Sequence, residues 1–322
     1  MTQVGLPFEA IPAGGLHGLA PWVVARNTLR LARGFFQVWK LAAEWKPEAL
    51  FVTGGFVSAP VALACWLRRV PILVYLPDIE PGWAIQFLSR LATRIAVTAE
   101  ASRKFLPADK VVVTGYPVRQ QVLMARGKKS EALAHFELDT SLKTILFVGG
   151  SKGAQTLNRP FSKMLDQVLS HWQVIHISGK TGADEMRVRY EQLSDDLKAR
   201  YKLFAYLHSE EMGLALAVAD VVVSRAGASI LGEFPLMGLP AILAPYQFAW
   251  HYQKVNADYL VQQGAAVRLD AETLDQTLWP TLEGLLGDEA RLTEMQERAR
   301  ALAWPDAAAN LAVQLRALAG AA

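Results

Sequence analysis

The stretch KTILFVGGSKGAQTLN (143–158) contains an apolar run, a glycine-rich turn and the start of a helical pattern. A turn of this kind joins a buried strand to a helix, where backbone N–H groups and the positive helix end can bind a phosphate. The same pattern also forms tight turns that bind nothing. Ser151 lies at the centre of this turn. The rest of the chain has to distinguish phosphate binding from a plain turn.

Short apolar runs rich in β-branched residues alternate with helical patterns along most of the chain. This alternation predicts repeated βαβ units and therefore a mainly parallel sheet. Runs that are apolar at nearly every position are typical of strands covered on both faces. We therefore predict the α/β class with doubly wound parallel sheets. The expected strands are 49–53, 71–75, 94–98, 110–114, 143–149, 173–178, 202–207, 220–224, 240–245 and 265–269.

A charged and polar stretch at residues 119–143 interrupts this pattern, and a new strand is expected directly after it. The chain has 322 residues, which is enough for two domains of ordinary size. The predicted divisions are 1–124 for the N-terminal domain, 125–141 for a linker, 142–302 for the C-terminal domain and 303–322 for a last helix that returns to the first domain.

The composition excludes several classes of protein. The formal net charge of +3 at pH 7 is too small to argue for nucleic acid as a partner. A single cysteine, Cys65, lies in an apolar run and allows no disulfide framework. No stretch approaches the roughly 18 uninterrupted apolar residues of a membrane span, and the N-terminus lacks a signal-peptide layout. We expect a cytoplasmic protein without a metal or cofactor.

The stretch DVVVSRAGASILGEFPLMGLPAILAPY (220–246) is the most informative part of the chain. Arg225 and Gly227 follow a strand, where a guanidinium and exposed backbone N–H groups can bind a diphosphate. Glu233 lies six residues further on, in the expected helix, and a carboxylate there can accept two hydrogen bonds from a ribose diol. The alternative for Glu233 is a solvated helix residue.

With HYQKVNADYLVQQGAA (251–266) after it, this stretch resembles the donor half of the MurG family. GGFVSAP (54–60), TGYPVR (114–119) and GGSKGAQTLN (149–158) resemble further motifs of that family, in its order. The resemblance implies the GT-B fold, with two Rossmann-like doubly wound domains and an interdomain cleft. It also implies an inverting glycosyltransferase that moves N-acetylglucosamine from UDP-N-acetylglucosamine to undecaprenyl-diphospho-muramoyl-pentapeptide, converting lipid I to lipid II in peptidoglycan synthesis.

The resemblance also assigns roles to single residues. Glu233 would hold the uridine ribose, and Arg119 matches a basic residue near the cleft. Gln253 and Asn256 would read the sugar hydroxyls, and their spacing of three places them on one helical face. The other implied contacts are Arg225, Gly227, Ala228 and Ser151 at the diphosphate, Tyr206 and Leu207 at the uracil, and Gly54, Gly55 and Ser58 on the acceptor side.

Two departures from the family affect the acceptor side. The family opens with a strand and a G-G-T-G-G-H turn, and about forty residues of that unit have no counterpart here. An upstream start, a partner that supplies the unit, or a damaged copy would each explain this. The family's H-E-Q-N segment is replaced by YLPDIEPG (75–82), where Asp78 and Glu80 are candidate bases. A proline-bounded turn is the alternative, so the catalytic base stays unassigned.

Residues 27–47 form an aromatic and basic helical stretch that can lie on an anionic membrane surface. An ordinary buried helix would share the apolar half of this pattern. The resemblance favours a peripheral protein on the inner face of the cell membrane.

Two other functions stay open at this point. The first is transfer of a UDP-sugar to another lipid acceptor, because the acceptor segment departs from the family. The second is a non-catalytic UDP-sugar-binding subunit that needs a partner.

Overall fold

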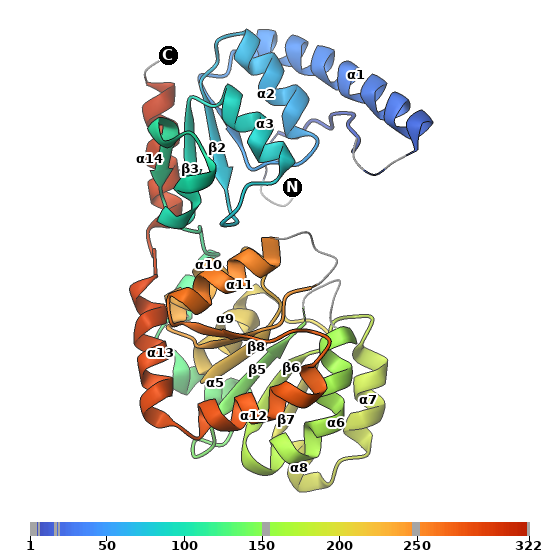
Figure 1. The fold of residues 1–322 in the computed structure, drawn as a ribbon, viewed down its shortest axis with the longest axis vertical. Coiled ribbons are helices and arrows are strands. Elements are labelled where there is room, and N and C mark those ends of the chain that lie inside the picture. Colours follow the sequence, from blue (N-terminus) through green and yellow to red (C-terminus); the bar gives the residue numbers. More distant parts are fainter. Residues whose placement is uncertain are drawn as a thin grey trace. The chain divides into compact units, whose positions relative to one another are not determined.

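The chain forms two compact units, each with its own parallel sheet (Figure 1). Unit 1 contains Met1–Thr114 and Ala308–Ala322, and unit 2 contains Gly115–Ala307. The computed structural model describes residues 5, 7–15, 18, 20–149, 155–246 and 252–320.

Unit 1 is built on a four-stranded sheet in the order β1-β2-β3-β4, in which all neighbours are parallel. Its helices are α1 Pro21–Trp45, α2 Ser58–Leu67, α3 Trp83–Leu91 and α14 Ala307–Ala319, with the short 3-10 helices η2 Glu100–Phe105 and η3 Ala108–Lys110. Its strands are β1 Leu50–Val52, β2 Ile72–Leu76, β3 Arg94–Val97 and β4 Val111–Val113.

Strand β2 shows why this sheet needs helices on both sides, because all five of its residues are buried. Alternate side chains of a strand point to opposite faces. Ile72, Val74 and Leu76 pack with α2 and α3 on one face. Leu73 and Tyr75 pack with α14 on the other face, where that helix runs beside the sheet in Figure 1.

Unit 2 is built on a six-stranded parallel sheet in the order β10-β9-β8-β5-β6-β7. Its strands are β5 Thr144–Val148, β6 Gln173–Ile177, β7 Tyr201–Phe204, β8 Val221–Ser224, β9 Ala241–Leu243 and β10 Ala266–Arg268. Its helices are α4 Gln120–Met124, α5 Lys129–His135, α6 Gln155–His171, α7 Ala183–Glu191, α8 Asp195–Ala199, α9 Ser209–Val218, α10 Ile230–Met237, α11 Tyr252–Gln262, α12 Leu274–Leu286 and α13 Glu289–Ala301.

This strand order is that of a doubly wound Rossmann-like domain. The chain moves outward in one direction from β5 to β7 and in the other from β8 to β10, so the order reverses between β5 and β8. The two strands pair directly, with Val148 opposite Ser224 at their carboxyl ends. Loops diverge at such a reversal, and ligands of open α/β sheets bind there.

The predicted α/β class and the ten predicted strands are confirmed, since each observed strand overlaps its expected range. The largest difference is at β7, which ends at Phe204, whereas the prediction extended to residue 207. The chain leaves the sheet there because His208 begins the turn into α9. The His208 amide donates to Glu211 Oε2 at 3.0 Å, which closes the first turn of that helix.

Residues 115–141 differ from the predicted division, which gave them to the first domain and a linker. The structure places them in unit 2. The charged residues of this stretch had suggested a solvated linker, but Val122, Ala132 and Phe136 are buried. At Gly213 of α9 an added Cβ would lie 2.8 Å from the Gln121 carbonyl oxygen, so α4 packs closely on α9. The stretch therefore folds as two amphipathic helices. The last helix, α14, groups with unit 1 from Ala308 onward.

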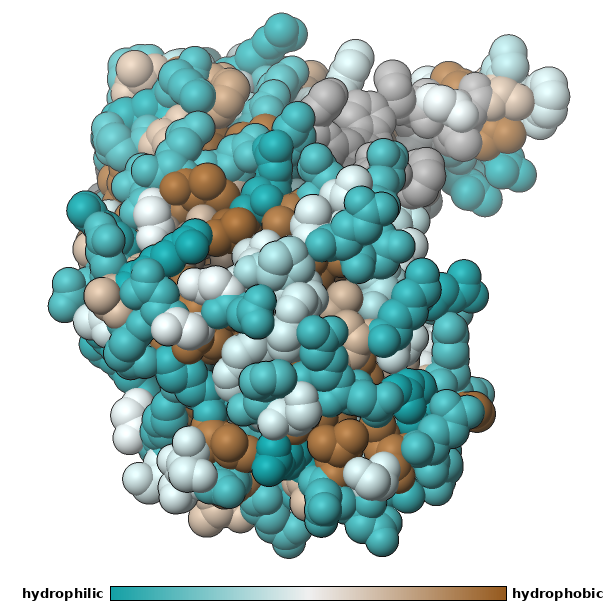
Figure 2. Space-filling view, turned by 60° about the horizontal axis from the view of Figure 1, so that its bottom comes forward, coloured by the Kyte–Doolittle hydropathy of each residue, from teal (hydrophilic) through white to brown (hydrophobic). Residues whose placement is uncertain are grey.

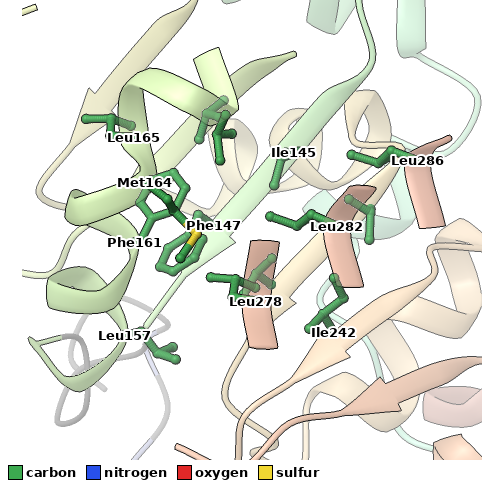
Figure 3. Packing of buried hydrophobic residues seen from close by; sticks show 14 of the residues in the cluster. Ile145, Phe147, Leu157, Phe161, Met164, Leu165, Ile242, Leu278, Leu282 and Leu286 are labelled. Carbon is green, nitrogen blue, oxygen red and sulfur yellow. The ribbon is translucent and has the colours of Figure 1, made fainter. Parts of the chain in front are cut away.

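The core of unit 2 lies between β5 and the helices α6 and α12 (Figure 3). The rings of Phe147 and Phe161 are stacked with their centroids 4.2 Å apart, and both side chains are fully buried. Leu278 and Leu282 of α12 belong to the same cluster. Because α6 contributes so much of this cluster, its packing fixes the position of the helix that begins at Gln155.

Hydrophilic residues cover most of the face drawn in Figure 2, and hydrophobic residues form small separate patches on it. Within the described part of the chain, no helix combines the length and hydropathy that crossing a bilayer requires.

Met164 of α6 tests whether this core stabilises unit 2. Its side chain is buried, whereas Met124 of α4 is 64 % exposed. Met164→Ala is expected to lower the free energy of unfolding by about 2–4 kcal/mol, because it removes buried surface and leaves a cavity. Met124→Ala is expected to change it by less than about 0.5 kcal/mol. Urea denaturation of both variants measures this difference, and equal effects would contradict the assigned core.

Candidate active site

A cavity of about 370 Å³ opens where the sheet order of unit 2 reverses. Val148 at the end of β5 and Ser224 at the end of β8 line it. The side chains around it come from segments far apart in the sequence, because the carboxyl ends of parallel strands meet at one edge of the sheet. The predicted binding residues that line the cavity are Arg119, Arg225, Gly227, Glu233 and Gln253.

Arg225 supplies a positive charge to the cavity although only 6 % of the residue is exposed. Its Nη1 donates to the Ala244 carbonyl at 2.7 Å and its Nη2 donates to the Thr156 hydroxyl of α6. Its Cζ lies 5.5 Å from the ring centre of Tyr246. Burial lowers the pKa of Arg225 to about 10, so the side chain is still a cation at neutral pH.

A desolvated guanidinium attracts an anion more strongly than a solvated one. Arg225 and the start of α10 next to it are therefore suited to a diphosphate. Among the described residues, no group of three or more His, Cys, Asp or Glu side chains is arranged to hold a metal ion.

Glu233 lies in the first turn of α10, because the helix begins at Ile230. Its side chain is 10 % exposed and pairs with Arg119. Both Nε and Nη2 of Arg119 donate to Glu233 Oε1, at 3.1 and 2.9 Å. The Glu233 carboxylate is thus a buried acceptor that faces the cavity, and the alternative of a solvated helix residue does not fit its burial.

The segment before Arg119 reaches Glu233 because Gly232 leaves room for it. An added Cβ at Gly232 would lie 2.7 Å from Cδ1 of Tyr116. The tyrosine ring therefore packs on the backbone of α10, and the chain continues from there to Arg119. Close approach of this kind requires glycine.

Gln253 and Asn256 lie on the same helix, α11, but occupy different surroundings. Gln253 lines the cavity, and its Oε1 accepts a hydrogen bond from the Tyr246 amide at 2.8 Å. Asn256 is fully buried, and its Nδ2 donates to the Ala226 carbonyl at 3.2 Å. In this structure the Asn256 amide supports the turn after β8, and its predicted contact with the sugar hydroxyls stays a prediction.

Besides Asn256, three predicted donor-side contacts do not line this cavity. Ala228 is half-buried in the turn before α10. Leu207 is buried, and Tyr206 is 61 % exposed with its ring against His208. Ser151 lies outside the described residues.

The apolar wall of the cavity was missed by the sequence analysis. Met212 and Leu216 of α9 and Phe234 of α10 line it. Met212 and Leu216 are four residues apart and share a helical face. That spacing is visible in the sequence, but it does not indicate a cavity wall, because it is equally typical of a helix face buried in a core.

The predicted acceptor-side residues of unit 1 meet in one turn after β1. Gly54 and Gly55 have φ values of +97° and +83°, in the left-handed region that favours glycine. Ser58 begins α2, and its hydroxyl donates to the Gly54 carbonyl at 2.5 Å. The serine hydroxyl therefore closes the turn between the strand and the helix.

Asp78 and Glu80 follow β2, the strand that pairs with β1, so they lie at the same sheet edge as the glycine turn. Both are half-buried. Thr98 fixes the start of their segment, since its hydroxyl donates to the Pro77 carbonyl at 2.8 Å. The sequence analysis gave these carboxylates as candidate bases, with a proline-bounded turn as the alternative, and the role of base stays a prediction.

A buried chain of hydrogen bonds lies beside the cavity at the start of α6. His176 of β6 has its Nδ1 2.6 Å from the Tyr201 hydroxyl and its Nε2 3.0 Å from Asn158 Oδ1. Asn158 Nδ2 donates to the Ser178 carbonyl at 2.9 Å. Because an amide oxygen only accepts, Nε2 of His176 carries the proton, and Nδ1 accepts from Tyr201.

Known proteins resemble the chain over nearly its whole length. Residues 1–97 match the glycosyltransferase family 28 N-terminal domain, and residues 144–311 match the C-terminal domain of the same family. The chain is 41 % identical to a UDP-N-acetylglucosamine–N-acetylmuramyl-(pentapeptide) pyrophosphoryl-undecaprenol N-acetylglucosamine transferase of Roseiflexus sp. (strain RS-1), over 98 % of this chain and 80 % of the relative. It is 32 % identical to the protein of the same name from Bacillus subtilis (strain 168), over 97 % and 85 %.

Solved structures resemble it in the same way. The crystal structure of Acinetobacter baumannii MurG matches with a TM-score of 0.73 and 25 % identity, over 94 % of this chain and 83 % of that one. UDP-GlcNAc 2-epimerase from Neisseria meningitidis matches with a TM-score of 0.67 and 15 % identity, over 90 % and 81 %. The second likeness is one of fold alone.

His176 makes the stability of unit 2 depend on pH. Burial lowers the pKa of folded His176 from 6.5 to about 3, so the unfolded chain binds more protons between these pH values. Its stabilising effect is complete above pH 6.5 and is lost as the pH falls toward 3. We expect the free energy of unfolding to fall by about 2 kcal/mol between pH 6.5 and 5 from this residue.

Chemical denaturation at the two pH values measures the effect. His176→Gln is expected to flatten the pH dependence, although the variant is less stable throughout. His171→Gln, at an exposed position of α6, keeps the wild-type dependence. An unchanged slope in His176→Gln would show that another group titrates.

Proposed function

The chain belongs to glycosyltransferase family 28 and, within it, to the MurG family, and we propose that it transfers N-acetylglucosamine from UDP-N-acetylglucosamine to undecaprenyl-diphospho-muramoyl-pentapeptide. This is the step from lipid I to lipid II in peptidoglycan synthesis. The enzyme is a hexosyltransferase with the GT-B fold. The observation that carries the donor assignment is that Arg225, Glu233 and Gln253 line one cavity at the sheet reversal.

In the proposed reaction the 4-hydroxyl of the acceptor sugar attacks the anomeric carbon as UDP leaves. The bond to the diphosphate oxygen breaks, and negative charge develops on the leaving group. Arg225 is already a cation and is held by Ala244 and Thr156, so it stabilises that charge without reorganising. The backbone at Gly227 lines the same cavity and lets the diphosphate approach the start of α10.

Glu233 is proposed to accept hydrogen bonds from both ribose hydroxyls. Its Oε1 already accepts from Arg119, so the ribose shares or replaces that contact. A guanidinium released from Glu233 stays next to the cavity and can pair with a phosphate oxygen. The apolar wall formed by Met212, Leu216 and Phe234 is the part of the cavity suited to the uracil ring.

The acceptor is proposed to bind at the glycine turn of unit 1. Gly54 and Gly55 expose backbone at the carboxyl end of β1, where an acceptor diphosphate can approach closely. Asp78 and Glu80 at the same sheet edge are the candidate bases that remove the hydroxyl proton. Lipid I fits this arrangement better than a neutral lipid, because its diphosphate can bind the backbone exposed at the glycine turn and a neutral lipid has no such anionic group.

Helix α1 is proposed to dock on the inner face of the cell membrane. Its buried side is made by Gly34, Val38 and Ala42. Away from that side, Trp22, Leu29 and Phe36 are exposed at seven-residue spacing and so form one stripe. A second stripe at the same spacing contains Arg26, Arg33 and Lys40, all exposed. Apolar and basic stripes side by side favour an anionic lipid surface.

Transfer of labelled N-acetylglucosamine tests the function. The protein is incubated with UDP-N-acetylglucosamine and either lipid I, undecaprenyl phosphate or diacylglycerol. Product from lipid I alone supports the proposal. Product from another lipid identifies a different acceptor, and UDP binding without any product indicates a binding subunit.

Glu233→Gln is expected to lower kcat/KM for UDP-N-acetylglucosamine by about 10- to 100-fold, because hydrogen bonds to a charged acceptor contribute about 1.5–3 kcal/mol. The loss is expected to be much smaller with the 2′-deoxyribose donor, which lacks one of the hydroxyls. Glu297→Gln, an exposed change on α13, is the matched control. Equal losses with both donors would contradict a ribose role for Glu233.

Replacing Trp22, Leu29 and Phe36 together with serine is expected to reduce binding to phosphatidylglycerol vesicles by at least about tenfold, because apolar surface contributes about 25 cal/mol per Å² removed from water. Val313→Ser on α14, which is 58 % exposed in the wild type, is the control. Vesicle co-sedimentation at low and high salt measures the binding. Unchanged binding of the triple variant would exclude this face of α1.

A further inference from the structure

The position of the Arg225 guanidinium depends on helix α6 as well as on its own strand. Nη1 is held at the end of β9 by the carbonyls of Ala244 and Pro245, at 2.7 and 3.3 Å. Nη2 donates to the hydroxyl of Thr156, in the first turn of α6. The two ends of the guanidinium fork are therefore fixed by two different elements, which sets the plane of the group.

The first turn of α6 is itself fixed to β6 and the loop after it by Asn158. This residue is 1 % exposed, and its amide bonds both His176 Nε2 and the Ser178 carbonyl. His176 is in turn held by the Tyr201 hydroxyl. Burial lowers the pKa of His176 far below neutral, so the ring is uncharged, and the Asn158 amide oxygen, which can only accept, keeps the ring proton on Nε2.

Close packing at Gly182 keeps Asn158 in this place. An added Cβ there would lie 2.3 Å from Asn158 Nδ2 and 2.7 Å from the Ser178 carbonyl oxygen. The loop after β6 therefore encloses the amide and leaves no space for it to turn away. Asn158 and Thr156 are two residues apart, so fixing one fixes the backbone of the other.

We propose that Thr156 is a positioning residue that sets Arg225 for the donor diphosphate, and that Asn158, held by His176 and Tyr201, keeps the first turn of α6 where Thr156 reaches the guanidinium. This inference rests on the proposed function, because it assumes that Arg225 binds the diphosphate of a UDP-sugar. Thr156 acts through Arg225 and takes no chemical part in the transfer.

The physical reason lies in the geometry of arginine. The N–H donors of a guanidinium all lie in one plane, so the orientation of that plane decides from which direction a phosphate oxygen can accept from the group. A long side chain that is not held loses rotamer entropy when it binds, and this loss weakens the ligand's affinity. Because Thr156 already holds the Arg225 side chain, less rotamer entropy is lost when the donor binds.

Thr156→Val keeps the shape of the side chain and removes the hydroxyl. Calorimetry with the full chain is expected to give about tenfold weaker binding of UDP and unchanged binding of uridine, which has no phosphate. Thr156→Ser restores the hydroxyl and is expected to bind UDP within about threefold of the wild type. Thr293→Val, at an exposed position of α13, is the matched control and leaves both ligands unaffected.

Tyr201→Phe tests the buried chain, since it removes only the hydroxyl that holds His176. We expect about threefold weaker UDP binding in the wild-type background and no additional loss in Thr156→Val, because the effect passes through the Thr156 hydroxyl. If Tyr201→Phe does not fold, His176→Gln at neutral pH takes its place with the same expectations.

The outcomes separate this inference from the proposed function. Equal UDP binding by the wild type and Thr156→Val overturns the positioning role and leaves the function intact. Equal losses of UDP and uridine in Thr156→Val also overturn it, because they indicate general damage to the cavity. Additive losses from Tyr201→Phe overturn the link through α6. A wild-type protein that binds no UDP overturns the function and the inference together.

Discussion

Burial of the unit 2 sheet on both faces is the constraint on which the candidate site depends. Strand residues from Ile145 to Phe147 and from Val221 to Val223 have no exposed surface, and their backbone groups are paired within the sheet. Polar chemistry therefore belongs at the strand ends, where the chain leaves the sheet. The order of strands reverses between β5 and β8, so their loops diverge and the cavity opens at that point.

Charge in the cavity is governed by desolvation. Burial disfavours the charged form of Arg225 and lowers its pKa to about 10, yet the group is still protonated at neutral pH. Its contacts with Ala244 and Thr156 replace part of the lost hydration. The same low dielectric that makes the cation costly strengthens its attraction for a diphosphate. Burial of the Arg225 cation therefore lowers the stability of the fold somewhat and leaves a preorganised positive charge in the cavity.

Unit 1 uses different physical means for the other half of the proposed reaction. Its glycine turn at Gly54 and Gly55 offers backbone rather than a buried cation. Its long helix α1 leaves aromatic side chains such as Trp22 and Phe36 exposed beside basic ones, whereas Phe161 of α6 is buried in the unit 2 core. A polyprenyl-linked acceptor lies at a membrane surface, and a soluble nucleotide-sugar does not. The two units thus match the different phases in which the two proposed substrates are found.

Local patterns were enough to predict the ten strands, the α/β class and Arg225 and Glu233 as candidate binding residues, because apolar runs and strand-to-helix turns involve only neighbouring residues. Three features could not be predicted in this way: Arg119 pairs with a carboxylate 114 residues away, the Asn256 amide supports the turn after β8, and residues 115–141 fold into unit 2. Each of these depends on which segments pack together. Packing is set by long-range contacts that no short stretch of sequence specifies.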